Sequence, residues 1–475
     1  MTVIITKVTI PEYDKLILHH CDTKYSLKPT SLRRILFDNY DYLSHLHQSG
    51  KLTDDTFHSL QMSILCSTYH LGYVTYECPN CHNYRVISRT CKSRFCNTCG
   101  AKYAATRAAY LSSISLDVPH RHIVFTIPKQ LRLYFAKYRE LLHLLFIASR
   151  NVIASWVNKS YLDKQKRMYK TLASIPPKLS SPYLFKDISL PNRFGAISTL
   201  HTFGRDLKFS PHIHMLVPEL YYHSKKDKLC PLTHFNYHFL RKTWQFQLLS
   251  ILKPFLPSHL LSSLYRDYKE GFYVYAFDPK REPDYHFDED SSTTNSLTYM
   301  LRYASRPAMA ESRITNYDSS TKTIDWFYHP HEDEDTLVKV HESVYDFLHK
   351  LLLHHPRKHF KMIRYYGFYA NACQLLLNHI HHLHSDNTSH KLTVKQRQRI
   401  EAVEKQKLYY RTFMISTFHK DPILCPCGTL MKYLDTFDPL DQEGRRLKND
   451  RRYRSQCINE MQKMQIPRVC TSLGS

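Results

Sequence analysis

The stretch Phe209-Ser-Pro-His-Ile-His-Met-Leu-Val217 sets two histidines two residues apart in what we expect to be a β-strand. Alternate residues of a strand point to the same face of a sheet, so His212 and His214 should share one face while Ile213 points to the other. Two neutral imidazoles side by side are a ready pair of ligands for a divalent metal ion. The stretch therefore predicts a metal site on one face of a sheet.

Histidine is common here, with 31 among 475 residues, so about two His-x-His strings are expected by chance. His45-Leu-His47 and His379-Ile-His381 lie in apolar-periodic segments typical of helices, where residues two apart point away from each other. His329-Pro-His331 contains a proline and is expected in a loop. The serious rival is His120-Arg-His122, which also has the pattern of a strand with both imidazoles on one face. Either strand pair could instead be ordinary buried or half-exposed histidines.

Composition restricts the class of partner. The formal charge is +24, from 66 basic against 42 acidic residues, which favours a polyanion, with nucleic acid ahead of an anionic membrane. No apolar run approaches the twenty residues of a membrane span and no signal-peptide pattern opens the chain, so we expect a soluble protein of the prokaryotic cytoplasm, associated with the nucleoid. The chain has 10 glycines and lacks the glycine-rich phosphate-binding motifs, which argues against ATP.

The order of expected elements favours a mixed α/β or α+β core. Helical patterns cover residues 1–70, 101–116, 130–157, 296–305 and 335–353, and strand patterns cover 120–127, 194–203, 209–217, 271–277 and 321–328. Strands and helices alternate and no internal repeat is present, which excludes a repeat array. Beyond residue 385 the chain is basic, helical and then poorly patterned.

A cysteine cluster predicts a structural zinc site. Of 13 cysteines, five fall between residues 78 and 99. Cys78-x2-Cys81 and Cys96-x2-Cys99 are separated by fourteen residues, which is close to the spacing of a four-cysteine zinc ribbon. Cys91 is an alternative ligand. The competing interpretation, reduced cysteines in a core, fits poorly with the polar residues around them.

Basic residues surround this cysteine module, and we assign Lys92 and Arg94 to DNA binding. Cys425-Pro-Cys427 resembles a degenerate half of a second ribbon, but no matching pair follows it in the sequence. The sequence alone therefore predicts no metal at that position.

Tyr299 and Tyr303 lie four residues apart in an expected helix and so should share one face. With 35 tyrosines such pairs arise by chance, and their usual role is an aromatic stripe against a core. Arg302 and Arg306 on the same helix could hold phosphate oxygens. A phenolate that attacks a phosphodiester beside a metal ion would form a covalent phosphotyrosine, which conserves the bond energy without ATP.

The set of motifs resembles the two-tyrosine HUH transposases of rolling-circle insertion sequences, with an N-terminal transposase zinc-binding domain. The resemblance covers about residues 30 to 370. It is carried by the cysteine-rich module, Pro119-His-Arg-His-Ile-Val-Phe-Thr-Ile-Pro128, Leu200-His-Thr-Phe-Gly204, Pro211-His-Ile-His-Met-Leu-Val217, Tyr299-x3-Tyr303, Arg306-Pro307 and Arg364-Tyr-Tyr-Gly367. It implies an α+β fold: an N-terminal helical and zinc-ribbon module, then an RRM-like antiparallel-sheet nuclease core with flanking helices.

The resemblance also implies the roles of the residues. His212 and His214 become ligands of a catalytic Mg²⁺ or Mn²⁺, and Tyr299 and Tyr303 become nucleophiles. We take His201 as the third ligand, with Asp206 and His122 in reserve. DNA-binding roles go to Arg302, Arg306, Arg94, Lys92 and Arg364. The expected domains are 1–117 (helical and zinc-binding), 118–370 (catalytic) and 371–475 (basic, with no assigned role).

The leading hypothesis is thus a transposase that nicks and joins single-stranded ends of a mobile element. A plasmid replication initiator or a relaxase would use the same chemistry. A non-catalytic zinc-dependent DNA-binding regulator would leave the histidines and tyrosines as ordinary structure. A tyrosine recombinase would need a further set of arginines and a histidine, and nothing in the sequence singles one out. The sequence does not define the oligomeric state.

Overall fold

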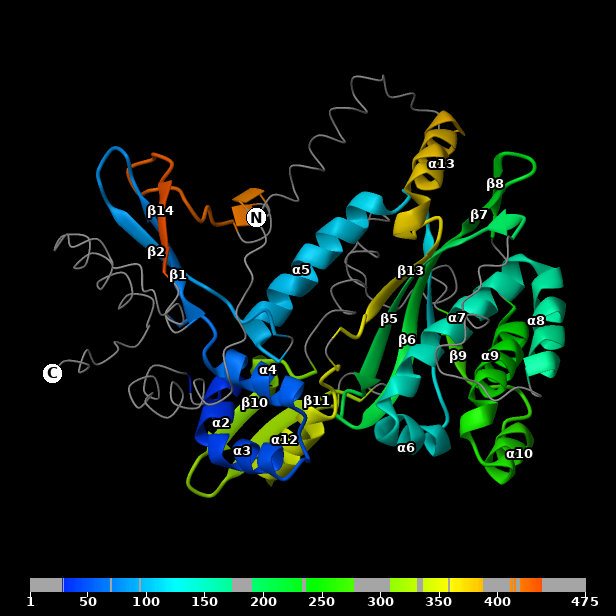
Figure 1. The fold of residues 1–475 in the computed structure, drawn as a ribbon, viewed down its shortest axis with the longest axis horizontal. Coiled ribbons are helices and arrows are strands. Elements are labelled where there is room, and N and C mark those ends of the chain that lie inside the picture. The colour runs from blue at the N-terminus through cyan, green and yellow to red at the C-terminus, as the bar shows by residue number, and fades with distance from the viewer. Residues whose placement is uncertain are drawn as a thin grey trace.

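The computed structural model describes residue 28, residues 30–68, 71–93, 95–172, 190–232, 236–276, 308–330, 336–357, 359–387 and 419–437, and residues 411, 412, 414 and 415. Helices and antiparallel strands are both present and are partly segregated along the chain, which confirms the α+β class. Figure 1 shows a large sheet with its helices at one end of the molecule and a small sheet at the other, with α5 between them.

The large sheet has five antiparallel strands in the order β13-β5-β6-β3-β9. Their bounds are β3 His120–Phe125, β5 Gly195–Phe203, β6 Phe209–Pro218, β9 Val274–Ala276 and β13 Ile363–Gly367. The sequence predicted β3, β5 and β6 closely, because each alternates or is continuously apolar over a short run. Strand β6 lies at the centre of the sheet.

One face of this sheet is covered by helices. Ile213, Met215 and Val217 of β6 point into a core that also contains Leu144 and Trp244. The helices are α6 Lys129–Lys137, α7 Leu142–Val157, α8 Lys159–Leu172, α9 Tyr237–Leu252 and α10 Ser258–Asp267. Alternation along β6 thus leaves His212 and His214 on the opposite face.

The segment Arg139–Val157 is the one described stretch that is long and apolar enough to cross a membrane by length and composition. With 19 residues it approaches the length of a membrane span, contrary to the expectation from the sequence. However, 78% of its apolar window is buried inside the protein, as expected of a helix that fills a core. A single helix spanning 130–157 was also expected, but the chain turns at Tyr138, where α6 ends, and re-enters a helix through a 3-10 turn, Arg139–Leu141.

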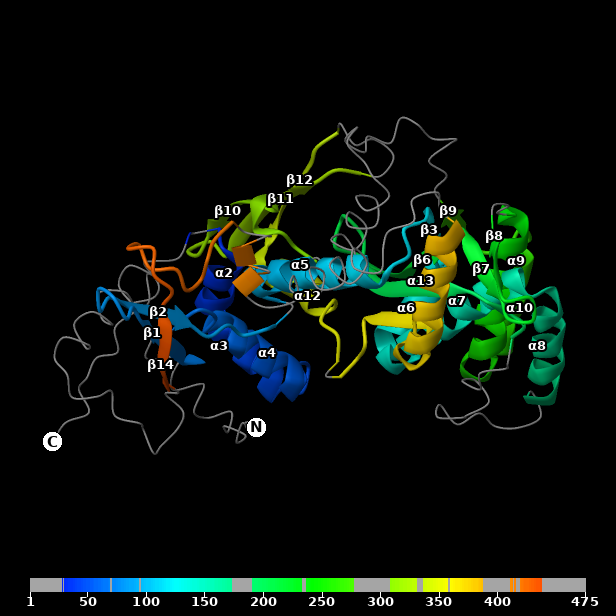
Figure 2. The same ribbon diagram turned by 90° about the horizontal axis from the view of Figure 1, so that it is seen from above.

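The opposite face is covered at one end by α5 (Asn97–Ile114) and α13 (Gln374–Asn387). Leu111 of α5 and Leu377 of α13 share a core with Ile197 and Leu216 of the sheet. Figure 1 shows α5 on the side of the sheet opposite to α7 and α9, and Figure 2 shows α5 running lengthwise toward the sheet strands. The part of this face that carries His212 and His214 lies outside this small core.

The N-terminal helices pack on residues that are remote in sequence. Helices α2 (Leu32–Asp38), α3 (Tyr40–Gln48) and α4 (Asp54–Ile64) share one core with three strands and a helix: β10 Ile314–Asp318, β11 Thr323–Tyr328, β12 Val338–Ser343 and α12 Val344–Leu352. The Asn39 amide donates a hydrogen bond to the Tyr317 hydroxyl at 3.0 Å across this junction. A boundary at residue 117 therefore does not separate the packing units.

Strand β12 occupies six residues of the segment that was expected to be one helix over 335–353. Val338 and Val340 alternate with polar residues, and β12 pairs with β11 over six residues, Thr323↔Ser343 to Tyr328↔Val338. Ser343 then caps α12 by accepting a hydrogen bond from the Tyr345 amide. Pairing with a partner strand overrode the local helical pattern.

A small sheet joins the N-terminal region to the C-terminal end of the described chain. Strands β1 (Tyr73–Glu77) and β2 (Tyr84–Ser88) form a hairpin, and β14 (Lys432–Phe437) pairs antiparallel with β1. Figure 1 shows β14 (orange) beside β1 and β2 (blue). The region after residue 371, to which the sequence assigned no role, thus contributes a helix, α13, that packs on the large sheet and a strand, β14, that pairs with β1.

Gly367 provides a test of this architecture. It ends β13 with a φ of +60°, and a Cβ atom there would lie 1.6 Å from the carbonyl oxygen of Phe194. We expect Gly367→Ala to destabilise the protein by about 3 kcal/mol, because left-handed strain adds to a clash with backbone. Gly50→Ala is the control, since Gly50 has a φ of +72° but nothing within 4 Å; it should cost about 1 kcal/mol. Equal losses in denaturant unfolding would contradict the prediction.

Candidate functional site

Three histidines meet on one face of the large sheet. His201 of β5 is directly opposite His212 of β6, and His214 follows on the same face of β6. One ring nitrogen from each lies within 4.8 Å of those of the others. His201 is buried and the other two are half-buried. The structure thus brings together the two histidines of the predicted pair and the residue proposed as third ligand.

Hydrogen bonds orient two of these rings. His212 donates from Nδ1 to the carbonyl oxygen of Ser210 at 2.7 Å, which leaves Nε2 as its ligating nitrogen. His214 Nδ1 lies 2.8 Å from Nε2 of His122 on β3. For His214 to ligate through Nε2, its Nδ1 must carry the proton and donate it to His122. Such bonds fix the tautomer and orientation of metal-binding histidines.

His122 and its neighbour His120 are therefore not a rival site. Strand β3 pairs with β6, so the His120/His122 face continues the His212/His214 face. Burial lowers the pKa of His122 to about 4, and the nearby His212 adds to the shift. His122 is thus neutral at physiological pH and can accept a hydrogen bond. His120 instead contacts the Tyr369 hydroxyl at 2.8 Å and donates to the carbonyl of Val118.

Asp206, the other reserve ligand, lies in the turn between β5 and β6. Its carboxylate accepts a hydrogen bond from the Lys208 amide at 3.1 Å and pairs with the Lys208 ammonium. Among the described residues it is not part of the histidine group. Asp206 therefore shapes the turn that connects the two ligand-bearing strands.

The predicted DNA-binding residues fall in different places. Arg364 lies on the helix-covered face of the sheet, with its guanidinium 4.4 Å from the centre of the Phe146 ring, and burial lowers its pKa. The structure therefore does not bring Arg364 to the histidine face. Lys92 is exposed beside Cys91. Tyr299, Tyr303, Arg302, Arg306 and Arg94 lie outside the described residues.

Eight of the ten described cysteines form two groups of four. Cys66, Cys91, Cys96 and Cys99 make one group, which we call cluster A. Cys78, Cys81, Cys425 and Cys427 make the other, which we call cluster B. The single site expected from Cys78, Cys81, Cys96 and Cys99 is corrected by this arrangement, because its four members are divided between the clusters.

The β1–β2 hairpin explains the division. Cys78 and Cys81 lie at its tip, while Cys66 and Cys91 lie at its base. Each strand has five residues, which span roughly 17 Å at about 3.3 Å per residue, so one ion cannot contact both ends. Cys91, given as an alternative ligand, belongs to cluster A. Sequence spacing carried no indication of Cys66, which follows α4.

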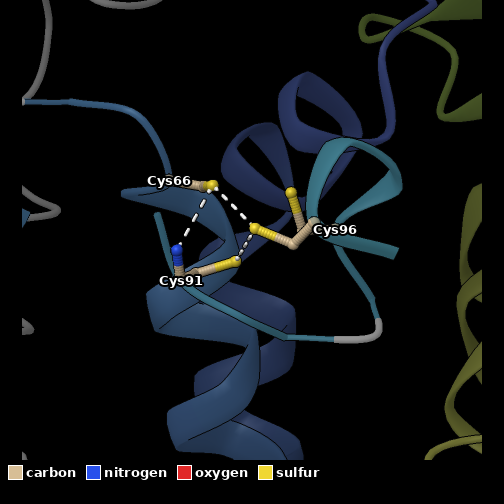
Figure 3. Close-up of side chains that lie close together, drawn as sticks. Cys66, Cys91 and Cys96 are labelled. Atoms are coloured by element: carbon tan, nitrogen blue, oxygen red, sulfur yellow. Dashed lines mark hydrogen bonds between the residues drawn. The ribbon is translucent and has the colours of Figure 1, made fainter. Parts of the chain in front are cut away.

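Cluster A lies where α4, the loop after β2 and the start of α5 meet. The sulfur atoms of Cys66 and Cys91 lie 3.6 and 3.5 Å from that of Cys99. Figure 3 shows Cys66, Cys91 and Cys96 pointing toward one another. A tetrahedral zinc with Zn–S bonds of about 2.3 Å requires sulfur separations of about 3.8 Å, far longer than a disulfide bond of about 2.05 Å. The donor set and its spacing fit Zn²⁺.

Two family models match the regions just described. A model for a transposase zinc-binding domain matches residues 38–127, which contain all of cluster A. A transposase model matches residues 195–375, which contain His201, His212 and His214. The fold and the two matches define a transposase with an N-terminal zinc-binding domain.

Relatives among known proteins give the family. The chain is 26% identical over 454 residues to the transposase for insertion sequence element IS801 of Pseudomonas savastanoi pv. phaseolicola, an alignment that covers 91% of this chain and 96% of the relative. It is 24% identical over 344 residues to the transposase y4qJ of Sinorhizobium fredii, covering 65% and 72%. No solved structure matches. The chain belongs to the IS91 family of insertion-sequence transposases, which includes the IS801 enzyme.

Cluster A yields a prediction about stability. Cys96→Ser should lower the zinc content by one ion per chain and reduce the thermal stability of the N-terminal helices, because zinc binding contributes directly to the folding of such modules. Cys373→Ser is the control, since Cys373 is a described free cysteine outside both clusters. Metal analysis and thermal unfolding of the two variants measure the difference, and equal behaviour would refute a role for cluster A in zinc binding.

Proposed function

We propose that this transposase nicks and rejoins single-stranded DNA through covalent phosphotyrosine intermediates, in a rolling-circle type of transposition. The observation that carries the proposal is the convergence of His201, His212 and His214 on one face of an antiparallel sheet. The resemblance to two-tyrosine transposases supplies the nucleophiles, Tyr299 and Tyr303.

His201, His212 and His214 would hold a Mg²⁺ or Mn²⁺ ion. When bound, the ion would polarise the scissile phosphate as a Lewis acid. Neighbouring groups of the chain would hold the ligating histidines in the correct tautomer. His122 would keep His214 in its ligating tautomer through the 2.8 Å contact, and the Ser210 carbonyl would do the same for His212.

In the proposed reaction the phenolate oxygen of a tyrosine bonds to the phosphorus, and the bond from phosphorus to a deoxyribose oxygen breaks, releasing a hydroxyl. A second hydroxyl later attacks the phosphotyrosine and restores a phosphodiester, so no ATP is consumed. Two tyrosines allow two successive transfers. The charge of +24 suits a DNA substrate, and we place the reaction on DNA in the bacterial cytoplasm.

A covalent adduct tests the nucleophiles. A labelled single-stranded oligonucleotide that carries the end of the mobile element should become attached to the protein in Mg²⁺ or Mn²⁺ and survive denaturing electrophoresis. Tyr299→Phe/Tyr303→Phe should abolish the adduct, because phenylalanine has no oxygen to attack phosphorus. Tyr265→Phe is the control, since this exposed tyrosine lies on α10 against the other face of the sheet. Wild type without an adduct, or a double mutant with an undiminished one, would defeat the proposal.

Metal affinity tests the histidine site. His201→Ala should abolish binding of one Mn²⁺ ion measured by titration calorimetry. His122→Ala should weaken it about tenfold, because second-sphere partners of ligating histidines typically contribute 10–100-fold.

The matched control for His122→Ala is His120→Ala. It removes an imidazole from the same face of the same strand, but one that contacts Tyr369 instead of His214. We expect its Mn²⁺ affinity to stay within roughly twofold of wild type, by the same comparison of second-sphere contacts. Identical affinities in the His122 and His120 variants would show that the His122 contact does not orient the site.

A further inference from the structure

Cluster B joins two parts of the chain that are far apart in sequence. Cys78 and Cys81 come from the turn at the tip of the β1–β2 hairpin, and Cys425 and Cys427 come from the turn that precedes β14. The partners Cys81 and Cys425 are separated by 344 positions. The zinc-binding domain match ends at residue 127 and so includes only half of this cluster.

The geometry of cluster B is that of a tetrathiolate metal site. The sulfur atoms of Cys81 and Cys425 are 3.4 Å apart and those of Cys78 and Cys427 are 3.5 Å apart. These separations lie close to the edge of about 3.8 Å in a zinc-centred sulfur tetrahedron. They are too long for disulfide bonds. The Asn80 amide donates a hydrogen bond to the Cys427 sulfur at 3.9 Å, as expected for a sulfur atom that carries negative charge.

Each half of cluster B is a tight turn that presents two thiols. The carbonyl of Cys78 accepts a hydrogen bond from the His82 amide at 3.0 Å, and that of Cys425 accepts one from the Gly428 amide at 2.9 Å. His82 and Gly428 both have left-handed backbone, with φ values of 56° and 82°. The two turns are therefore equivalent halves of one site, although the second has one residue fewer between its cysteines.

The apolar core around cluster B is small. Its local core consists of Cys78, Cys425 and Met431, with Tyr76 and Cys81 packed against them. Such a core is too small to hold a separate unit together, and small modules of this kind depend on a metal. A hydrogen bond also joins the two parts of the chain here: the Arg85 guanidinium of β2 donates to the Pro422 carbonyl at 3.1 Å.

We infer that cluster B is a second structural zinc site, distinct from cluster A, that fastens residues 419–437 to the N-terminal zinc-binding domain. The domain is then composite. Its third strand, β14, and half of its second metal site come from the C-terminal part of the chain. Zinc in cluster B sets where that part of the chain is anchored.

Zinc counting on the full chain tests the inference. In a His212→Ala/His214→Ala background, which removes metal bound at the histidine site, we expect two zinc ions per chain by mass spectrometry. Adding Cys425→Ser/Cys427→Ser should leave one, and adding Cys373→Ser should leave two. One zinc in the parent, or two in the Cys425/Cys427 variant, would overturn the inference.

Hydrogen exchange of the same full-length proteins tests the fastening. Loss of cluster B should speed amide exchange in β1 and β14 at least tenfold, whereas Cys96→Ser in cluster A should remove one zinc and leave β14 unchanged. Cys427 is exposed, so Cys427→Ser alone offers a variant that replaces no buried side chain. It should weaken zinc retention against a chelator and speed β14 exchange. Unchanged β14 exchange after loss of the cluster B zinc would overturn the fastening role.

Discussion

The register of β5 on β6 is the constraint on which the histidine site depends. His201 opposes His212 in this pairing, and Thr199 opposes His214. A slip of one residue would turn His201 to the helix-covered face and would expose apolar side chains in its place. The core beneath the sheet, where Leu200 and Ile213 pack with the helices, thus fixes the register. Burial of one face therefore determines the chemistry of the other.

Helix α5 connects this sheet to the zinc-binding region. Its first turn contains Cys99 of cluster A, and its last turns pack through Leu111 on the histidine-bearing face of the sheet. An unbroken helix of 18 residues spans about 27 Å at about 1.5 Å per residue. A metal that orders the start of α5 therefore also supports the helix that covers part of the candidate site.

Local patterns in the sequence predicted most of the large sheet and the shared face of its histidines. They could not predict which distant segments pack or pair with each other. Alternation marked β3, β5 and β6, and the shared face of His212 and His214 follows from strand geometry alone. The grouping of cysteines failed because spacing along the chain does not say which turns face each other. Cys425 and Cys427 had no matching cysteine pair after them in the sequence. Cys78 and Cys81 were grouped with Cys96 and Cys99, which belong to cluster A. Strand β12 was missed for the same reason, since only its pairing with β11 distinguishes it from helix.

Magnitudes indicate why residues 419–437 would need a metal to stay attached to the N-terminal domain. In the unfolded chain, bringing together Cys81 and Cys425, which are 344 positions apart, costs about 5 kcal/mol in chain entropy. The pairing of β14 with β1 matches five residues of each strand, Tyr73↔Phe437 to Glu77↔Lys432, and cross-strand pairs contribute about 0.2–1 kcal/mol each. Pairing alone therefore yields roughly 1–5 kcal/mol, which does no better than balance the closure cost. Structural zinc sites contribute about 10–16 kcal/mol, so in cluster B the metal, and not the strand, would decide whether the C-terminal segment remains on the N-terminal domain.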